Sequence, residues 1–201
     1  MQSVSDRPHH RPVTPGGNFF ESLVGGTDPA LVSEAADRAA TLLVRGAHET
    51  GDAEVAERLL HLADTEGIET IAEVWSGSPA DSLAGCLWRL YLLRSWVYAD
   101  PAGVAREFEA GQRSAQVARV VAGVADPPGP DQLKAMVDQV LRGIAGSDFA
   151  DVLLRAAAFA RVVATGRASL SGPTEAEVQR MLVLSEQLEA AGHAELDHGL
   201  A

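Results

Sequence analysis

Two arginines and four aromatic residues crowd into one apolar stretch of the sequence, residues 83–98. The stretch reads LAGCLWRLYLLRSWVY and is apolar on nearly every side of a helix, which is typical of the buried centre of a bundle. A guanidinium group in such a helix must be paired, stacked on an aromatic ring or extended to water. Helical spacing places Arg89 and Arg94 on different faces of the helix.

Two kinds of chemistry fit these arginines. In the first, each arginine pairs with an acidic residue of a neighbouring helix, as buried charges commonly do. In the second, arginine holds a small anionic ligand inside the bundle and an aromatic ring stacks on that ligand. The sequence leaves both interpretations open. The candidate ligand-binding residues are Trp88, Arg89, Tyr91 and Arg94.

The usual catalytic motifs are missing. The single lysine, Lys134, follows Gln132-Leu133 instead of a glycine, so a phosphate-binding loop of the Walker type is excluded, and a Gly-x-Ser-x-Gly serine elbow is absent. Cys86 lies in the most apolar helix with no local histidine or asparagine, which predicts a buried, inert thiol. No catalytic residue and no cofactor is assigned, and an enzyme is the less favoured class.

Metal binding is not favoured either. Paired Glu-x-x-His motifs of the kind that build di-iron bundles are absent. One helix face does carry a cluster of acids and a histidine, but it lies opposite the apolar face of that helix, so we interpret it as an exposed charged stripe. This cluster consists of Glu54, Glu57, His61 and Asp64.

An apolar group near the amino terminus is a second candidate for binding. Its residues recur at the i and i+4 spacing of one helical turn. Such a group either docks on its own domain or forms a partner-binding helical motif, and the sequence does not separate the two. The candidate partner-binding residues are Phe19, Phe20, Leu23 and Val24.

Charge narrows the classes of partner. The net charge is −12, with 15 arginines and one lysine, and a negative field of this size argues against a nucleic-acid surface. Residues 49–81 carry nine acids against the single basic residue Arg58. This acidic region is either a set of solvated helix faces or the docking surface of a basic protein.

The compartment is predicted from what the sequence lacks. A single cysteine fits a reducing environment, and residues 1–18 contain no apolar run that could serve as a signal peptide. No stretch approaches the roughly 18 apolar residues of a membrane span. We therefore expect a cytoplasmic protein without a membrane partner.

These candidate residues require a helical scaffold. Residues 1–26 are rich in proline and glycine and are predicted to form a flexible tail with an apolar tip, followed by one helical domain over residues 27–201. A helix is expected to open at Thr27-Asp28-Pro29 and to end near Gly51, and another spans residues 52–67. The inward face of the first helix is predicted to carry Val32, Ala35, Ala39 and Leu42.

The remaining helices follow from caps and periodicity. A short helix covers residues 68–76, the apolar helix is expected to open at Ser78-Pro79, and the next opens at Asp100-Pro101. After a proline-rich linker at 126–130, a helix with Lys134, Asp138 and Arg142 on its wet face is expected. Two more are predicted to end at Gly166 and at Gly192, the second opening with a capping box at Thr174. The sequence thus predicts an all-α bundle of seven or eight helices, without β-strands.

Several short runs resemble the opening of an uncharacterised group of all-helical proteins from high-GC actinobacteria. These runs are Arg11-Pro12, Pro15-Gly16-Gly17-Asn18-Phe19-Phe20-Glu21, Leu23-Val24-Gly25-Gly26 and Asp28-Pro29, and later Trp88-Arg89-Leu90-Tyr91-Leu92 with Arg94. The resemblance implies a bacterial, cytoplasmic origin and brings no activity, cofactor or site with it.

Two functions follow from these features. The first is a non-enzymatic helical module that binds another protein or a second copy of itself, through the acidic region 49–81 or the Phe19-Phe20 segment. The alternative is a helical bundle that binds a small anionic ligand, with Arg89 or Arg94 as the anchor.

Overall fold

A computed structural model describes residues 29–45, 68–114, 128–141 and 149–200. The described ranges contain seven α-helices and no β-strand, which confirms the predicted all-α bundle. The predicted tail, its apolar tip and the predicted helix over 52–67 lie outside the described residues. The helices are α2 (Pro29–Arg45), α5 (Ile68–Val74), α6 (Leu83–Ala99), α7 (Pro101–Ser114), α9 (Pro130–Leu141), α10 (Phe149–Ser169) and α11 (Glu175–His198).

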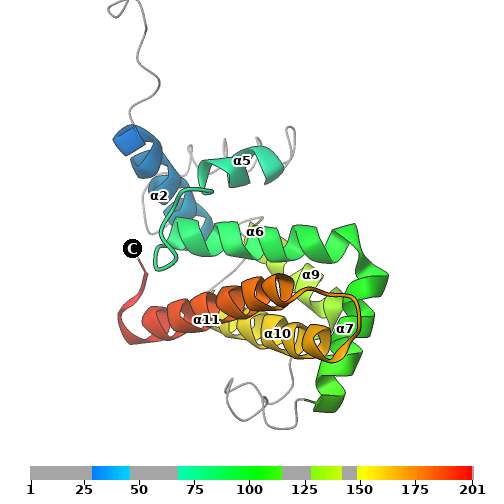
Figure 1. The fold of residues 1–201 in the computed structure, drawn as a ribbon. Coiled ribbons are helices and arrows are strands. Elements are labelled where there is room, and N and C mark those ends of the chain that lie inside the picture. The colour runs from blue at the N-terminus through cyan, green and yellow to red at the C-terminus, as the bar shows by residue number, and fades with distance from the viewer. Residues whose placement is uncertain (1–28, 46–67, 115–127, 142–148, 201) are drawn as a thin grey trace, which may run out of the picture.

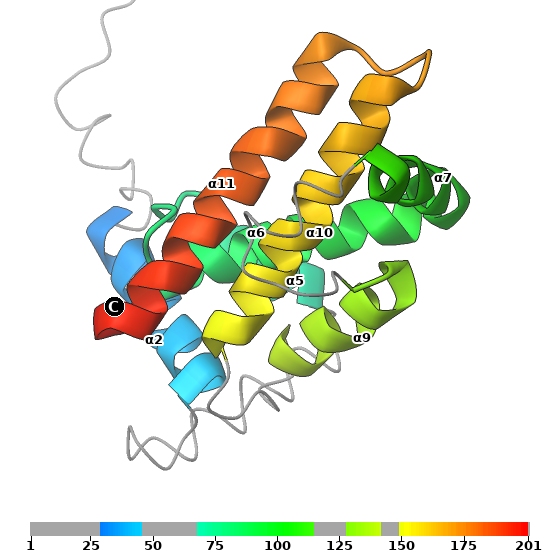
Figure 2. The ribbon, with the colours of Figure 1, turned by 90° about the horizontal axis from the view of Figure 1, so that it is seen from below.

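The helices are arranged around one hairpin. Helices α10 and α11 lie side by side, and α6 crosses one face of the pair (Figures 1 and 2). Helices α2 and α5 lie against the beginning of α6, whereas α7 continues from its end and packs along α10. None of the helices in the described ranges is long and apolar enough to cross a membrane.

Helix α6 is the centre of the bundle, as its apolar sequence predicts. Its buried residues, including Leu87, Leu90 and Leu93, belong to one hydrophobic core shared with α7, α9, α10 and α11. The predicted start at Ser78-Pro79 was wrong. The helix begins at Leu83 because the side chain of Ser82 accepts a hydrogen bond from the Gly85 backbone N–H over 3.1 Å and caps the first turn.

The inward face of α2 differs from the prediction. Leu42 is buried as expected, but Ala35 is exposed, and the small residues that face the core are Ala36 and Ala40. The indole Nε1 of Trp75 donates a hydrogen bond to the Ala36 carbonyl over 3.2 Å. Small side chains on this face let α2 approach the fully buried ring of Trp75, in the turn after α5, and this contact sets which face turns inward.

Two glycines allow α7 and α10 to pack closely. The prediction that Gly166 ends its helix was wrong, since α10 continues to Ser169. A Cβ built on Gly166 would lie 1.8 Å from the Glu107 carbonyl oxygen, and one built on Gly111 would lie 1.8 Å from the Val162 carbonyl oxygen. Both residues are therefore contact points between helices instead of helix ends.

Helix α11 begins as predicted and ends later than predicted. The capping box is present: Thr174 Oγ1 accepts from the Glu177 N–H over 3.3 Å, and Glu177 Oε2 accepts from the Thr174 N–H over 2.7 Å. The helix then continues through Gly192 to His198, so the predicted end at Gly192 was wrong.

A polar latch joins α2 to the end of α11. Arg45 pairs with Glu195, its Nη2 lying 2.8 Å from Glu195 Oε2, and it also donates to the Leu200 carbonyl over 3.2 Å. The Leu200 N–H donates to Glu195 Oε2 over 2.7 Å. Burial alone raises the pKa of Glu195, but the hydrogen bonds from Arg45 and Leu200 and the charge of Arg45 outweigh it, so the pKa is lowered.

We expect the latch to make stability depend on acid pH. Because the pKa of Glu195 is lower in the folded chain, its contribution is present above the unfolded pKa and is lost as pH falls through the folded value. In urea unfolding at pH 7, Glu195→Gln should lower the free energy of unfolding by about 1.5–3 kcal/mol. The difference from the unmodified chain should shrink towards pH 3, and a difference that stays constant with pH would contradict this role.

The α7 and α10 contact gives a second prediction. In a helix interior alanine is favoured over glycine by about 0.5–1 kcal/mol, but the clash with a backbone carbonyl outweighs this gain. Gly166→Ala should therefore lower the free energy of unfolding by about 1–3 kcal/mol, measured by urea and far-ultraviolet circular dichroism. Gly129→Ala, just before α9, is the control for the clash, because nothing lies within 4 Å of its Cβ position, and an equal loss in both variants would refute the packing argument.

Candidate functional site

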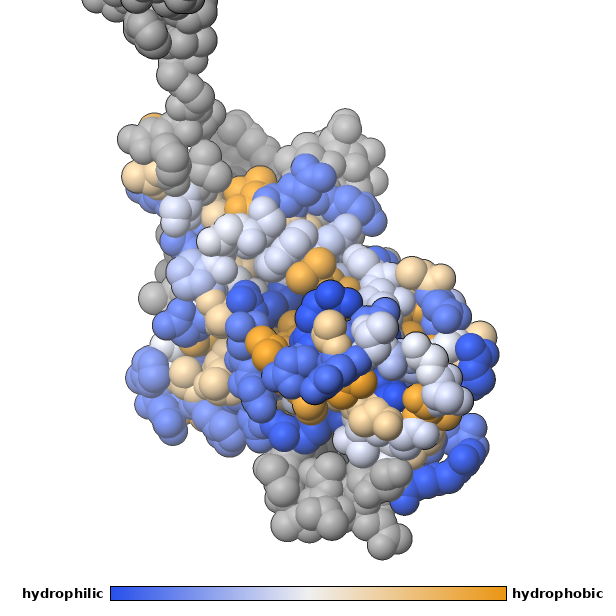
Figure 3. Space-filling model, in the orientation of Figure 1, coloured by the Kyte–Doolittle hydropathy of each residue, from blue (hydrophilic) through white to orange (hydrophobic). Residues whose placement is uncertain are grey.

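A groove of about 560 Å³ runs between α6 and α11 and ends at α10. Figure 3 shows hydrophobic residues, in orange, set among hydrophilic ones, in blue, over the middle of the face where α6 and α11 lie. The lining combines two tryptophans, several aliphatic side chains, three arginines, one glutamate and one amide. The lining residues are Trp88, Arg89, Leu92, Leu93, Trp96, Arg167, Glu177, Arg180, Met181, Val183, Leu184 and Gln187.

Arg89 lines one end of the groove. Its Nε donates to Gln187 Oε1 over 2.7 Å, and its Nη1 donates to the Gly85 carbonyl over 2.8 Å. Both acceptors are neutral, and within the described ranges Arg89 forms no ion pair. The guanidinium is therefore fixed in position and half-buried, and none of the described carboxylates matches its charge.

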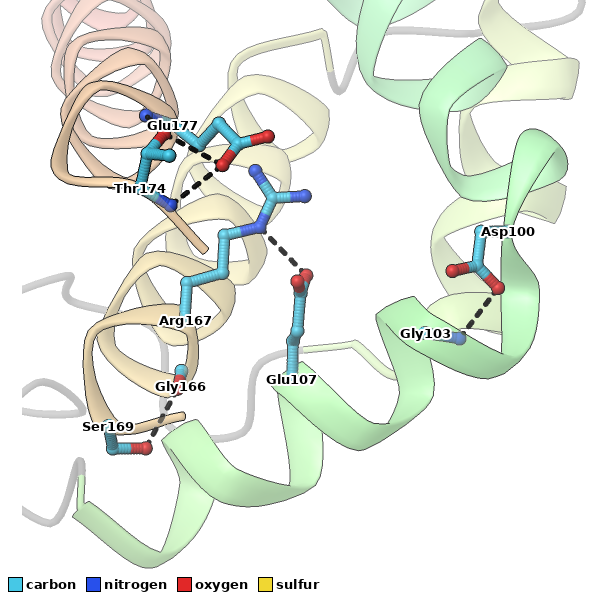
Figure 4. Close-up of polar contacts among 8 residues, drawn as sticks. All are labelled: Asp100, Gly103, Glu107, Gly166, Arg167, Ser169, Thr174 and Glu177. Carbon is cyan, nitrogen blue, oxygen red and sulfur yellow. Dashed lines mark hydrogen bonds and ion pairs between the residues drawn. The ribbon is translucent and has the colours of Figure 1, made fainter. Parts of the chain in front are cut away.

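Arg167 closes the other end. Its Nε lies 2.9 Å from Glu107 Oε2, and its guanidinium carbon lies 4.5 Å from the centre of the Trp96 ring. Figure 4 shows the Arg167 side chain between Glu107 of α7 and Glu177 of α11. The charge of Arg167 is thus already balanced by Glu107, and one face of Trp96 is already covered.

The rim at this end carries one charge of each sign. The pKa of Glu177 is lowered, first by the hydrogen bonds from the Thr174 backbone and side chain and then by the positive charges of Arg167 and Arg180. Glu177 therefore stays ionised at neutral pH beside the exposed Arg180. Neither Arg89 nor the exposed Arg180 forms an ion pair within the described ranges, but Arg180 lies in the field of Glu177, so Arg89 is the half-buried arginine of the groove without a described carboxylate partner.

The structure separates the two arginines that the sequence singled out. Arg94 lies away from the groove, where its Nε pairs with Asp138 of α9 and its guanidinium carbon lies 4.3 Å from the Tyr98 ring centre. Asp138 was expected on the wet face of α9, but it also accepts a hydrogen bond from the Tyr98 hydroxyl over 3.1 Å. An ion pair thus explains how the charge of Arg94 is stabilised in the bundle. Within the described residues no ion pair does the same for Arg89.

Of the two aromatic candidates for ligand binding, one lines the groove and the other does not. Trp88 lines the groove, and Tyr91 stacks on it with ring centres 5.6 Å apart, without reaching the groove itself. Arg167 was not predicted because Gly166 was interpreted as the end of its helix. Arg180 was not predicted because no local pattern connects α11 with α6. The apolar tip candidates Phe19, Phe20, Leu23 and Val24 lie outside the described residues.

The described residues bring together no group of three or more histidine, cysteine, aspartate or glutamate side chains that could hold a metal ion. The cluster of acids and a histidine at residues 54–64, which we interpreted as an exposed charged stripe, lies outside the described ranges. Cys86 is fully buried in α6, and burial raises the pKa of its thiol to about 12, partly opposed by the positive charge of Arg89. Its thiolate is therefore scarce at neutral pH.

We expect this thiol to be protected by the fold. In native buffer at pH 8 the thiol should not react with a disulfide reagent such as dithionitrobenzoate within an hour, because it is buried and protonated. In guanidinium chloride one equivalent should react within seconds to minutes. Rapid reaction of the native chain would show that α6 is not the closed centre of the bundle.

Comparison of the chain with protein-family models, with curated proteins and with solved structures finds no match in any of the three. The geometry of the groove is therefore the basis on which a function is proposed.

Proposed function

We propose that this chain is a non-enzymatic binding protein that holds a small organic anion in the groove between α6 and α11. The observation that carries the proposal is Arg89, a half-buried guanidinium held by two neutral acceptors at the end of an apolar groove. Its position is fixed before any ligand arrives, so little conformational entropy is lost when an anion binds. A carboxylate there would gain charge-assisted hydrogen bonds.

Binding requires that the ligand have both an apolar part and a negative charge. A body that buries about 200 Å² of apolar surface contributes roughly 5 kcal/mol, at about 25 cal/mol per Å². This is close to the lower estimates of the free energy lost on association. A charged hydrogen bond to Arg89 supplies about 1.5–3 kcal/mol more, so neither an ion without a body nor a neutral body is expected to bind well.

The protein-interaction hypothesis has less support from the described part of the chain. Its Phe19-Phe20 segment lies outside the described residues, as does most of the acidic region 49–81. The groove, in contrast, is lined entirely by described side chains. A cytoplasmic location, supported by the single cysteine, and the actinobacterial origin that the sequence resemblance implies are kept as parts of the proposal.

The test compares two ligands that differ in charge. Octanoate should shift the indole ¹H–¹⁵N signals of Trp88 and Trp96, which line the groove, and leave that of the buried Trp75 nearly unchanged. 1-Octanol should bind at least about tenfold more weakly, as expected for the loss of one charged hydrogen bond.

Variants of Arg89 test whether this residue binds the carboxylate of octanoate. Arg89→Gln should weaken octanoate binding about tenfold and change octanol binding less than about twofold. Arg89→Lys should retain part of the affinity because it keeps the charge. Arg106→Gln, at an exposed arginine of α7 outside the groove, is the control and should change neither. Equal binding of octanoate and octanol, or full octanoate affinity in Arg89→Gln, would falsify the proposal.

A further inference from the structure

The two ends of the groove lie far apart along its helices. Arg89 contacts Gln187 at one end, and at the other end Arg167 covers Trp96 and lowers the pKa of Glu177, so α6 crosses α11 with the two chains running in roughly opposite directions (Figure 2). Arg89 and Trp96 are seven residues apart, as are Arg180 and Gln187. At about 1.5 Å per residue, each pair spans about 10 Å along its helix.

Only aliphatic side chains line the groove between these ends. Leu92 and Leu93 lie on the α6 side, and Met181, Val183 and Leu184 lie on the α11 side. Leu92 and Val183 are unusually open for residues of their type, with 41% and 39% of their surfaces exposed. An apolar ligand body lying along this strip would cover surface that now faces water.

The tryptophan faces are partly occupied by the protein itself. Tyr91 stacks against Trp88, and the Arg167 guanidinium lies over Trp96. An aromatic ligand sandwiched between indole rings would have to compete with both contacts. The space that needs no rearrangement is the aliphatic strip, which suits a flexible chain better than a flat ring.

The charges place the anionic end of such a ligand. Among the described residues, Arg89 is the half-buried groove arginine without a carboxylate partner, whereas Glu107 pairs with Arg167, and the exposed Arg180 lies in the field of Glu177. Glu195, about two turns beyond Gln187 on α11, is held by Arg45 and Leu200 and is not free to pair with Arg89. Arg89 is therefore the anchor for a single negative charge.

We propose that the groove selects a straight-chain monocarboxylate, with its carboxylate on Arg89 and its alkyl chain lying along the aliphatic strip towards Trp96. The inference rests on the proposed function and adds the shape and length of the ligand. One methylene advances an extended chain by about 1.25 Å, given a C–C bond of about 1.5 Å. About eight methylenes therefore fill the strip, which corresponds to a carboxylate of about ten carbons.

The experiment measures the affinity of the full chain for straight-chain carboxylates from butanoate to dodecanoate, each below its micelle concentration. Affinity should rise about two- to fourfold with each added methylene, as expected for partial to full burial of that group. The rise should level off near decanoate, where the strip ends at Trp96. Adamantane-1-carboxylate, a compact anion with a large apolar body, should bind at least about tenfold more weakly than decanoate.

Two matched variants test the strip itself. Leu92→Glu places a charge in the middle of the strip and should reduce the ratio of decanoate to butanoate affinity at least tenfold. Leu170→Glu is the control, because Leu170 is 40% exposed, nearly the same as Leu92, but lies outside the groove. It should leave the ratio unchanged, and circular dichroism should show both variants to be folded.

The outcomes separate this inference from the proposed function. If carboxylates bind but affinity does not depend on chain length, or if adamantane-1-carboxylate binds as tightly as decanoate, the straight-chain ligand is wrong and an anion site remains. If affinity rises from decanoate to dodecanoate as steeply as it does between the shorter acids, the ligand does not lie along a strip of this length. If no carboxylate binds at all, the proposed function itself fails.

Discussion

The close approach of α7 and α10 at Gly111 and Gly166 is the constraint on which the candidate site depends. Without side chains at these two positions, the α7 backbone comes so near α10 that Glu107 lies within hydrogen-bonding distance of Arg167. That ion pair turns the Arg167 guanidinium onto the Trp96 ring, which closes one end of the groove. A wider separation of the two helices would leave Arg167 without its carboxylate and the groove open at that end.

Local signals in the sequence predicted several helix starts, although the start at Ser78-Pro79 was wrong. The proline at residue 29, the proline at residue 101 and the capping box at Thr174 all mark starts that the structure confirms, because each acts through its own first turn. Helix ends were predicted less well. Gly166 and Gly192 look like stop signals locally, but both lie inside helices, and a glycine that makes room for a neighbouring helix cannot be recognised without that neighbour.

The same distinction applies to the candidate site. Helical spacing correctly placed Arg89 and Arg94 on different faces of α6, since that depends on one helix alone. Which arginine is balanced depends on elements far along the chain: Asp138 comes from α9, and the neutral Gln187 comes from α11. The contribution of Arg167 depends in turn on three helices meeting. Sequence periodicity describes one helix at a time. It therefore identified the groove residues of α6 and missed those that α10 and α11 contribute.

The latch between α2 and α11 has a consequence for how the chain is made. Arg45 and Glu195 are 150 residues apart, so α2 leaves the ribosome long before its partner exists. At about 5–20 residues per second, that interval is roughly 8–30 s. The apolar face of α2 carries Ala36, Ala40 and Leu43. Until Trp75 has been made, this face lacks its packing partner, and until Glu195 has been made, α2 also lacks the latch. Nascent chains therefore expose this apolar face of α2 to water until the later helices have been made.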